Sequence, residues 1–300
     1  MIIPRRRTIL SILGLATLLG FVIGEVFILV VGKAMLAPYR GDMPPPPPHA
    51  NEVSFKDSAT DGQIAAWHYP QPTQSEPHRG AVLLVHGIRA NRLVMLQRAN
   101  WLVDHGFTVL AIDLQAHGTS TGDRITLGRL ESDNVRAGVA WLRTQIPQNT
   151  PVTVIGISLG GASALIGKGC GADAVVSEAA FGDIETALSN RLAHHLGGRW
   201  GRIFTPLLSW NLPLICGSQT SNLSPIEGAA YLNIPLLVMN GSADVHATPE
   251  EAKAIHSAAP NGKATLVIFE GATHADLYQF DPARYEKVVL EFLDTVEVNR

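Results

Sequence analysis

The stretch TVIGISLGG at residues 153–161 decides the fold, and it continues into the apolar run ASALI. β-Branched residues up to Gly156 predict a buried strand, and the residues from Leu159 onward predict a helix. Gly156 and Gly160 leave room for a sharp turn that places Ser158 at its tip. The turn also aims the Leu159 N–H and the positive end of the helix at an anion forming beside Ser158. It therefore predicts a nucleophile and half an oxyanion hole, although a plain strand–turn–helix junction with a solvated serine is the alternative.

Further apolar runs of strand length lie on both sides of this stretch. They do not alternate with polar residues, as expected of strands buried on both faces of a parallel sheet. Helical spacing between them predicts an α/β fold, with a mostly parallel twisted sheet and helices on both faces. The alternation fails from about 183 to 232, where we predict a small helical lid. The runs are AVLLV at 81–85, FTVLAI at 107–112, AVV at 174–176, PLLVM at 235–239 and TLVIF at 265–269.

The amino terminus carries a signal for one transmembrane helix. Three arginines at 5–7 precede a mostly apolar segment at residues 8–31, which at about 1.5 Å per residue is long enough to span a bilayer. The excess of basic residues before the segment predicts a cytoplasmic amino terminus and a periplasmic or extracellular domain. A cleaved signal peptide is the alternative, although its apolar region is usually only about 7–15 residues long. Glu25 marks contact with another helix or reaches water near the outer interface, and we favour the second interpretation.

The composition divides the chain into three segments. We expect residues 1–32 to form a cytoplasmic stub and transmembrane anchor, residues 33–50 a proline-rich linker, and residues 51–300 the α/β domain. The linker contains MPPPPPH at 43–49, and successive prolines adopt an extended helix of about 3.1 Å per residue. We therefore expect a stiff spacer that holds the domain away from the membrane.

The net charge of -3 predicts no nucleic-acid partner, because polyanion binding needs a basic surface. Cys170 and Cys216 are the only cysteines, and their spacing fits neither a zinc site nor a redox pair. Outside the cytoplasm they can pair with each other if the fold brings them together. We expect no metal site, and the sequence does not determine the oligomeric state.

In a sheet of this kind, ligands meet the carboxyl ends of the strands. The segment His86-Gly87-Ile88 follows one apolar run, and the Ile88 N–H can complete the oxyanion hole with Leu159. His86 itself is interpreted as structural. His117 lies in a turn after the next apolar run, and we do not expect it to be the catalytic base.

Two further turns supply an acid and an imidazole downstream of Ser158. Asp244 follows the apolar run that ends at residue 239, and His274 follows the last run. A serine needs a base to take its proton and an acceptor that fixes the tautomer of that base. The order serine, acid, histidine is that of a nucleophile-elbow hydrolase. Glu178 also follows a strand and competes with Asp244 for the acid role, and Asp276 is a weaker competitor.

These motifs resemble those of the α/β-hydrolase superfamily over residues from about 50 to 298. The similarity is greatest to the esterase, monoacylglycerol-lipase and serine-aminopeptidase-like branch, whose members often have G-H-G-x-S-x-G where this chain has Ala116 first. The segment SPI at 224–226 is similar to one that often precedes the acid-bearing strand in that branch. The resemblance implies a hydrolase without a cofactor that forms a covalent acyl-enzyme. The matching elements are His86-Gly87, AHGTSTG at 116–122, GISLG at 156–160, the Asp244 turn and the His274 turn.

The leading hypothesis is a membrane-anchored serine hydrolase that cleaves carboxylic esters, with amides left open, through an acyl-serine intermediate. A peptidase or acyltransferase with the same triad is one alternative. A tethered binding or scaffold module of the same fold is another, and the complete set of triad residues argues against it. The partner that we expect is a small-molecule ester or amide of unspecified acyl and alcohol groups.

Overall fold

The computed structural model describes residues 6–57, 59–71, 79–274 and 276–296. An eight-stranded sheet with the order β10-β9-β8-β7-β4-β5-β3-β2 forms its centre. Neighbouring strands run parallel except around β3, which pairs antiparallel with β2 and β5. The strands are β2 (Asn51–Lys56), β3 (Gln63–Tyr69), β4 (Ala81–Val85), β5 (Thr108–Ile112), β7 (Val152–Ile157), β8 (Ala174–Glu178), β9 (Leu236–Gly241) and β10 (Ala264–Phe269).

Helices cover both faces of the sheet. Successive residues of each central strand point to opposite sides, and both sets of side chains are apolar and must be buried. In β4, Leu83 and Val85 pack in the cluster that contains α3, α4 and α8, whereas Val82 and Leu84 pack with α2 and α10. This arrangement confirms the predicted fold class. The covering helices are α2 (Leu96–Asp104), α3 (Arg129–Arg143), α4 (Leu159–Ile166), α8 (Pro249–Ala258) and α10 (Pro282–Leu293), with the short η1 (Arg92–Met95) and α9 (Leu277–Phe280) beside them.

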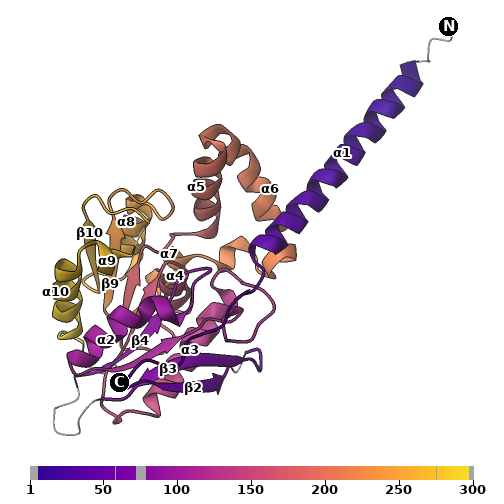
Figure 1. Ribbon diagram of the computed structural model, residues 1–300. Helices are drawn as coiled ribbons and strands as arrows, with labels where there is room; N and C mark the ends of the chain where they lie inside the picture. Colours follow the sequence, from indigo (N-terminus) through magenta and orange to yellow (C-terminus); the bar gives the residue numbers. More distant parts are fainter. Residues whose placement is uncertain (1–5, 58, 72–78, 275, 297–300) are drawn as a thin grey trace.

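The predicted lid region is helical. It contains α5 (Ile184–Leu196), α6 (Gly198–Cys216), η2 (Thr220–Asn222) and α7 (Pro225–Ala230). Figure 1 shows α5 and α6 as a hairpin that rises from the body of the domain, while α7 lies lower, near α4. Trp200, Phe204 and Trp210 therefore belong to a projecting hairpin, and they do not pack in the core of the sheet.

The first helix, α1 (Arg6–Met35), projects away from the sheet (Figure 1). Its segment Leu13–Met35 has a mean hydropathy of 2.4 in its most apolar window, and that window has no buried residue. Among the residues that the structure describes, α1 is the one helix long and apolar enough to cross a membrane. A membrane anchor and a signal sequence both fit this composition.

The start of the predicted linker lies on the domain instead of separating it from α1. Leu36 is buried in the core, and its carbonyl accepts a 2.8 Å hydrogen bond from the Ile125 N–H. The strand β1 (Tyr39–Arg40) pairs in parallel with β6 (His117–Gly118). The proline run therefore follows a segment that is already anchored, and it cannot act as the spacer between the domain and α1.

The two cysteines do not form a disulfide. Cys170 and Cys216 are both buried and free. Burial raises the pKa of the Cys170 thiol to about 12, which keeps it protonated and unreactive.

Candidate active site

Ser158 occupies a strained turn between β7 and α4. Its φ of 50° lies in the left-handed region that residues with a side chain rarely adopt. The conformation is enforced by close packing, because a Cβ on Gly156 would collide with the Gly160 backbone, and a Cβ on Gly160 would collide with the Val85 carbonyl. The two glycines of the motif thus let the helix begin directly against two strands, which places the serine at the carboxyl end of β7, where only 7% of the residue is exposed.

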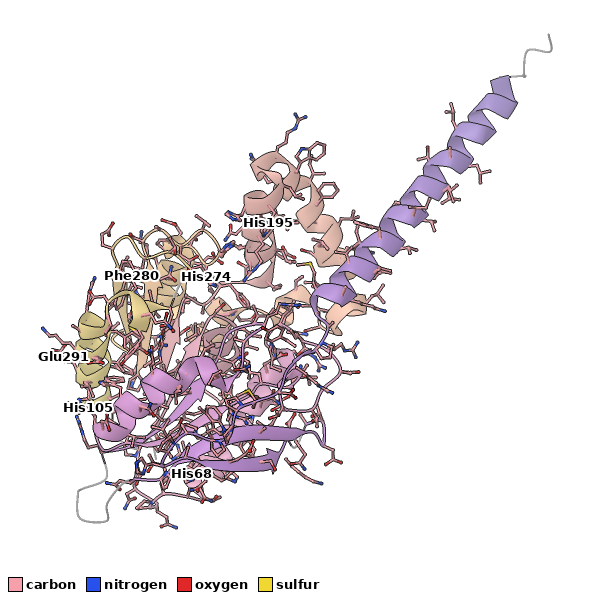
Figure 2. The ribbon with its side chains drawn as sticks, viewed as in Figure 1. His68, His105, His195, His274, Phe280 and Glu291 are labelled. Carbon is pink, nitrogen blue, oxygen red and sulfur yellow. The ribbon has the colours of Figure 1, made fainter. Side chains whose placement is uncertain are left out.

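The structure brings Ser158, His274 and Asp244 together from three loops. The Ser158 Oγ lies 3.4 Å from His274 Nε2, and His274 Nδ1 lies 2.7 Å from Asp244 Oδ2. His274 is partly exposed, with 23% of its side chain accessible, whereas the Asp244 side chain is fully buried. Figure 2 labels His274 below the α5–α6 hairpin. The serine distance is long for a hydrogen bond, as is common before a substrate is bound.

The Asp244 carboxylate has one oxygen held by the backbone and one left for the histidine. Its Oδ1 accepts hydrogen bonds from the N–H groups of His246 at 2.8 Å and Ala247 at 3.0 Å. Its Oδ2 accepts from His274 Nδ1–H, which places the unprotonated Nε2 toward Ser158. This geometry gives the imidazole the tautomer that a general base requires.

The competing carboxylates belong to a separate buried network. Glu178 Oε2 lies 2.8 Å from Arg98 Nη2, and the Tyr285 hydroxyl donates to the other oxygen of Glu178. Arg98 also makes two hydrogen bonds to Asp276, at 2.9 and 2.7 Å. Burial raises the pKa of Glu178, and the Arg98 guanidinium opposes that rise. Glu178 and Asp276 thus neutralise a buried arginine, whereas Asp244 faces His274.

The two residues predicted to form the oxyanion hole, Ile88 and Leu159, line the same pocket as Ser158. Leu159 is the first residue of α4, so its N–H has no partner within the helix. A Cβ on Gly87 would come within 3.5 Å of Ser158 Cβ, which shows how closely this turn approaches the nucleophile.

His86 and His117 hold loops in place. His86 Nε2 accepts from the Leu114 N–H at 3.1 Å, and its Nδ1–H donates to the Gly87 carbonyl at 2.7 Å. His117 Nε2 accepts from the Arg89 N–H at 3.1 Å. Burial, aided by the neighbouring His117, lowers the pKa of His86 to about 3. Both imidazoles are thus neutral and engaged with the backbone, which fits the interpretation of His86 as structural and the expectation that His117 is not the catalytic base.

A pocket of about 240 Å³ adjoins Ser158, and its walls are mainly apolar. Gly32, Met35 and Leu36 at the end of α1 form one wall, and aliphatic residues of α5 and α6 form another. Two arginines, Arg89 and Arg191, complete the lining. Sequence reasoning missed the contribution of α1, because no local pattern indicates that an apolar amino-terminal helix will line the pocket beside Ser158. The described residues contain no cluster of three or more His, Cys, Asp or Glu that could hold a metal ion.

Helix α5 of the lid contacts the loop that carries Asp244. Asn190 of α5 donates a 3.3 Å hydrogen bond to the His246 carbonyl and a 2.9 Å bond to Glu251. The rings of His194 and His246 pack with centroids 4.9 Å apart, and His246 in turn lies 5.5 Å from His274. α5 therefore forms a fixed outer boundary of the site.

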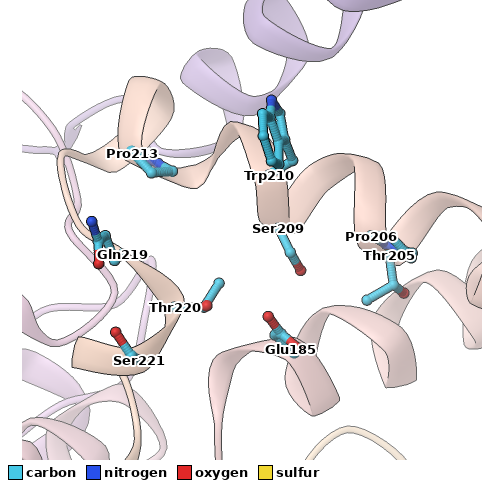
Figure 3. Close-up of a pocket in the computed structure, with 9 residues that line it drawn as sticks. All are labelled: Glu185, Thr205, Pro206, Ser209, Trp210, Pro213, Gln219, Thr220 and Ser221. Atoms are coloured by element: carbon cyan, nitrogen blue, oxygen red, sulfur yellow. The ribbon is translucent and has the colours of Figure 1, made fainter.

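A larger hollow of about 600 Å³ lies elsewhere in the lid, between α5, α6 and η2 (Figure 3). Its lining is rich in hydroxyl groups, including Ser209, Thr220 and Ser221, with Glu185 opposite Ser209. None of the residues predicted to act in catalysis lines it. The smaller pocket is therefore the candidate site, since it contains Ser158.

Comparisons with known proteins agree with this geometry. The model of the Alpha/beta hydrolase family matches residues 82–288. The uncharacterized protein YqkD of Bacillus subtilis is 26% identical over 220 residues, which cover 72% of this chain and 71% of that protein. YfhR of Escherichia coli (strain K12), also uncharacterized, is 26% identical over 250 residues, covering 78% and 80%.

Solved structures share the fold. A Pyrococcus furiosus esterase superposes with a TM-score of 0.71 at 21% identity, covering 88% of this chain and 99% of the esterase. An esterase from Exiguobacterium antarcticum superposes with a TM-score of 0.57 at 16% identity, covering 81% and 99%. At these sequence identities, the similarity to the two esterases shows a shared fold only.

Proposed function

The chain belongs to the alpha/beta hydrolase family, and from this premise we propose that it is a membrane-anchored serine hydrolase that cleaves carboxylic esters. The observation that carries the proposal is the connected series from Ser158 Oγ through His274 to the buried Asp244 carboxylate. The aliphatic walls of the pocket beside Ser158 support an apolar acyl group as the part of the substrate that is bound.

In the first half of the reaction, Ser158 Oγ attacks the ester carbonyl carbon while His274 Nε2 takes the hydroxyl proton. Asp244 stabilises the imidazolium that forms, and the N–H groups of Ile88 and Leu159 stabilise the oxyanion. When the tetrahedral intermediate collapses, the bond to the alcohol oxygen breaks and His274 returns the proton to the departing alcohol. The product of this half-reaction is an acyl ester of Ser158.

In the second half, a water molecule takes the place of the alcohol. His274 Nε2 removes a proton from the water, which attacks the acyl carbon through the same oxyanion hole. Collapse of the second intermediate releases the carboxylic acid and returns the proton to Ser158. The same groups of this chain thus perform both half-reactions, and no cofactor is needed.

We propose that α1 anchors the enzyme, with residues 8–31 in the bilayer, the amino terminus in the cytoplasm and the hydrolase domain periplasmic or extracellular. The length and hydropathy of Leu13–Met35 support the anchor. The arginines before the apolar segment support the orientation. The same helix is a wall of the active-site pocket, so retention of α1 in the mature protein is consistent with an intact site.

A fluorophosphonate probe tests the nucleophile and the orientation together. Intact cells that express the full chain are labelled with a membrane-impermeant probe and, in parallel, with a permeant one. We expect both probes to label the wild type and neither to label Ser158→Ala, while the alanine variant keeps the same apparent melting temperature. Labelling of Ser158→Ala at the wild-type rate would remove Ser158 as the nucleophile. Labelling by the permeant probe alone would reverse the proposed orientation.

A further inference from the structure

The lid helix α6 has two apolar faces. On one face, Leu208, Leu212 and Ile215 line the pocket beside Ser158. A surface helix of a soluble domain has a single apolar stripe, and a helix that is apolar on both sides is usually buried on both. The second face of α6 is instead open, with exposed side chains at helical spacing. They are Trp200, Ile203, Phe204, Trp210 and Leu214, with exposed fractions from 38% to 82%.

This open face lies on the same side of the domain as α1. The Asn211 side chain of α6 donates a 2.9 Å hydrogen bond to the Glu25 carboxylate of α1, 186 residues away in the sequence. Gly32 contacts Ile215 so closely that an added Cβ would lie 2.6 Å from Ile215 Cδ1. Figure 1 shows the α5–α6 hairpin and α1 projecting from the same side of the domain.

The contact with Glu25 fixes the depth of α6 relative to the membrane. Glu25 lies six residues before Val31, the end of the predicted span, which corresponds to about 9 Å along the helix. A helix that contacts α1 at this depth lies within the outer interfacial layer, where amphipathic helices bury their apolar side by about 5–10 Å. Trp200 and Trp210 are residues typical of that layer, and Arg199 and Arg202 provide charges for lipid headgroups.

The pocket and the membrane share a wall. Gly32 and Met35 of α1 and Leu212 of α6 line the pocket, while the opposite surfaces of both helices are apolar and exposed. We propose that α6 lies in the outer leaflet beside α1, and that the acyl chain of a membrane-borne ester passes from the bilayer into the pocket between α1, α5 and α6. This inference rests on the proposed function of Ser158 and specifies its substrate as a lipid-like ester.

Contact with lipid can be measured through tryptophan. Trp200 and Trp210 are in the hairpin, whereas Trp67, Trp101 and Trp141 are in the hydrolase domain. The full chain is placed in nanodiscs of ordinary or brominated phosphatidylcholine, because bromine quenches only nearby indole rings. We expect lower emission in the brominated discs, and we expect the double variant Trp200→Phe, Trp210→Phe to lose most of that difference. Equal emission of the wild type in both kinds of disc would overturn the proposal.

Delivery of substrate is tested with the variant Trp200→Gln, Phe204→Gln, Trp210→Gln, none of which lines the pocket. On a long-chain nitrophenyl ester carried in vesicles, we expect kcat/KM to fall by about tenfold or more, since three large apolar side chains no longer enter the lipid. On soluble nitrophenyl acetate, kcat/KM should stay within about twofold of wild type. Phe280→Gln is the matched control, because Phe280 is exposed on the far side of the domain from α1 (Figure 2).

The two substrates separate this inference from the proposed function. If wild type hydrolyses neither ester, the proposed function fails. Two results would overturn the route from the bilayer, provided that wild type hydrolyses nitrophenyl acetate. In the first, the hairpin variant loses activity equally on both esters; in the second, it keeps full activity on both. A hairpin variant that converts a dimer into a monomer would assign the open face to a second copy of the chain, which also overturns it.

Discussion

Replacing Asp244 with asparagine isolates the role of the acid, because the change keeps the shape of the side chain. The oxygen of the new amide can still accept from the N–H groups of His246 and Ala247. Its NH₂ group then faces His274 Nδ1, and that group can only donate. The histidine must therefore carry its proton on Nε2, pointing it at Ser158, where a base is needed.

The expected loss is large and confined to the chemical step. A wrong tautomer together with loss of the imidazolium partner lowers kcat by about 10⁴, equivalent to about 5.5 kcal/mol of activation free energy. KM should change little, because Asp244 is buried and does not line the pocket. Asp244→Asn should keep its fold, since its backbone hydrogen bonds survive.

Glu178→Gln provides the matched comparison. It should lower the stability of the protein and leave kcat nearly unchanged. Removing one partner of a buried ion pair costs about 3–5 kcal/mol. We expect the lower end, because Asp276 continues to pair with Arg98 at 2.7 Å. At about 2–4 °C per kcal/mol for a domain of this size, a loss of about 3 kcal/mol lowers the melting temperature by about 6–12 °C. Since Glu178 is not hydrogen-bonded to His274, folded protein should keep most of its kcat.

The assay is nitrophenyl ester hydrolysis by purified full-length protein, with thermal unfolding measured on the same samples. Both variants are compared well below the melting temperature of Glu178→Gln, so that only folded protein contributes. A Glu178→Gln variant that is fully folded and about 10⁴-fold slower, beside an active Asp244→Asn variant, would refute the assignment of Asp244 and move the acid to Glu178.

Two further changes test the pocket wall and a buried histidine. Gly32→Leu should push α1 away from Ile215 and lower kcat/KM on long-chain esters by about tenfold, with little effect on acetate esters. Gly24→Leu is the control, because Gly24 has open space around it and the change should leave both activities unaltered. If both variants show the same dependence of kcat/KM on chain length, α1 does not form a wall of the pocket. Because the pKa of His86 is lowered to about 3, below about pH 6.5 the unfolded chain binds a proton that the folded chain does not, so acid destabilises wild type. The melting temperature of His86→Asn should therefore fall less between pH 7 and pH 5, and an equal fall would exclude His86 as a source of acid sensitivity.

The sequence predicted the sheet and the nucleophile turn because their causes are local. A run of apolar residues such as 81–85 has no polar alternation, so both of its faces must be covered. Gly156 and Gly160 are required by backbone contacts within a few residues of Ser158 and with the adjacent strand. Short-range patterns of this kind can be recognised in the amino-acid sequence, and the structure contains the strands and the turn that they predict.

The choice between acids depended on residues that no local pattern connects. Glu178 is the last residue of β8 and Asp244 follows β9, so both lie at the carboxyl ends of neighbouring parallel strands. What separates them is Arg98, which comes from α2 and engages Glu178 in a network closed by Tyr285 near the carboxyl terminus. Topology identifies the candidates from the sequence, but the partner of each carboxylate is a property of tertiary packing.

The contact that Glu25 of α1 makes could not be predicted for a related reason. A transmembrane helix that serves only as a tether has no need of a carboxyl group, and Glu25 is costly in lipid unless a partner satisfies it. The structure provides Asn211 of α6 as a hydrogen-bond partner of Glu25, which agrees with the first interpretation, contact with another helix. With Gly32 against Ile215 and Leu36 in the core, the polar and small residues of α1 match features of the lid. The polar and small residues of α1 are therefore explained by what the helix contacts, and a substitution that leaves its hydropathy unchanged can still disturb the site beside Ser158.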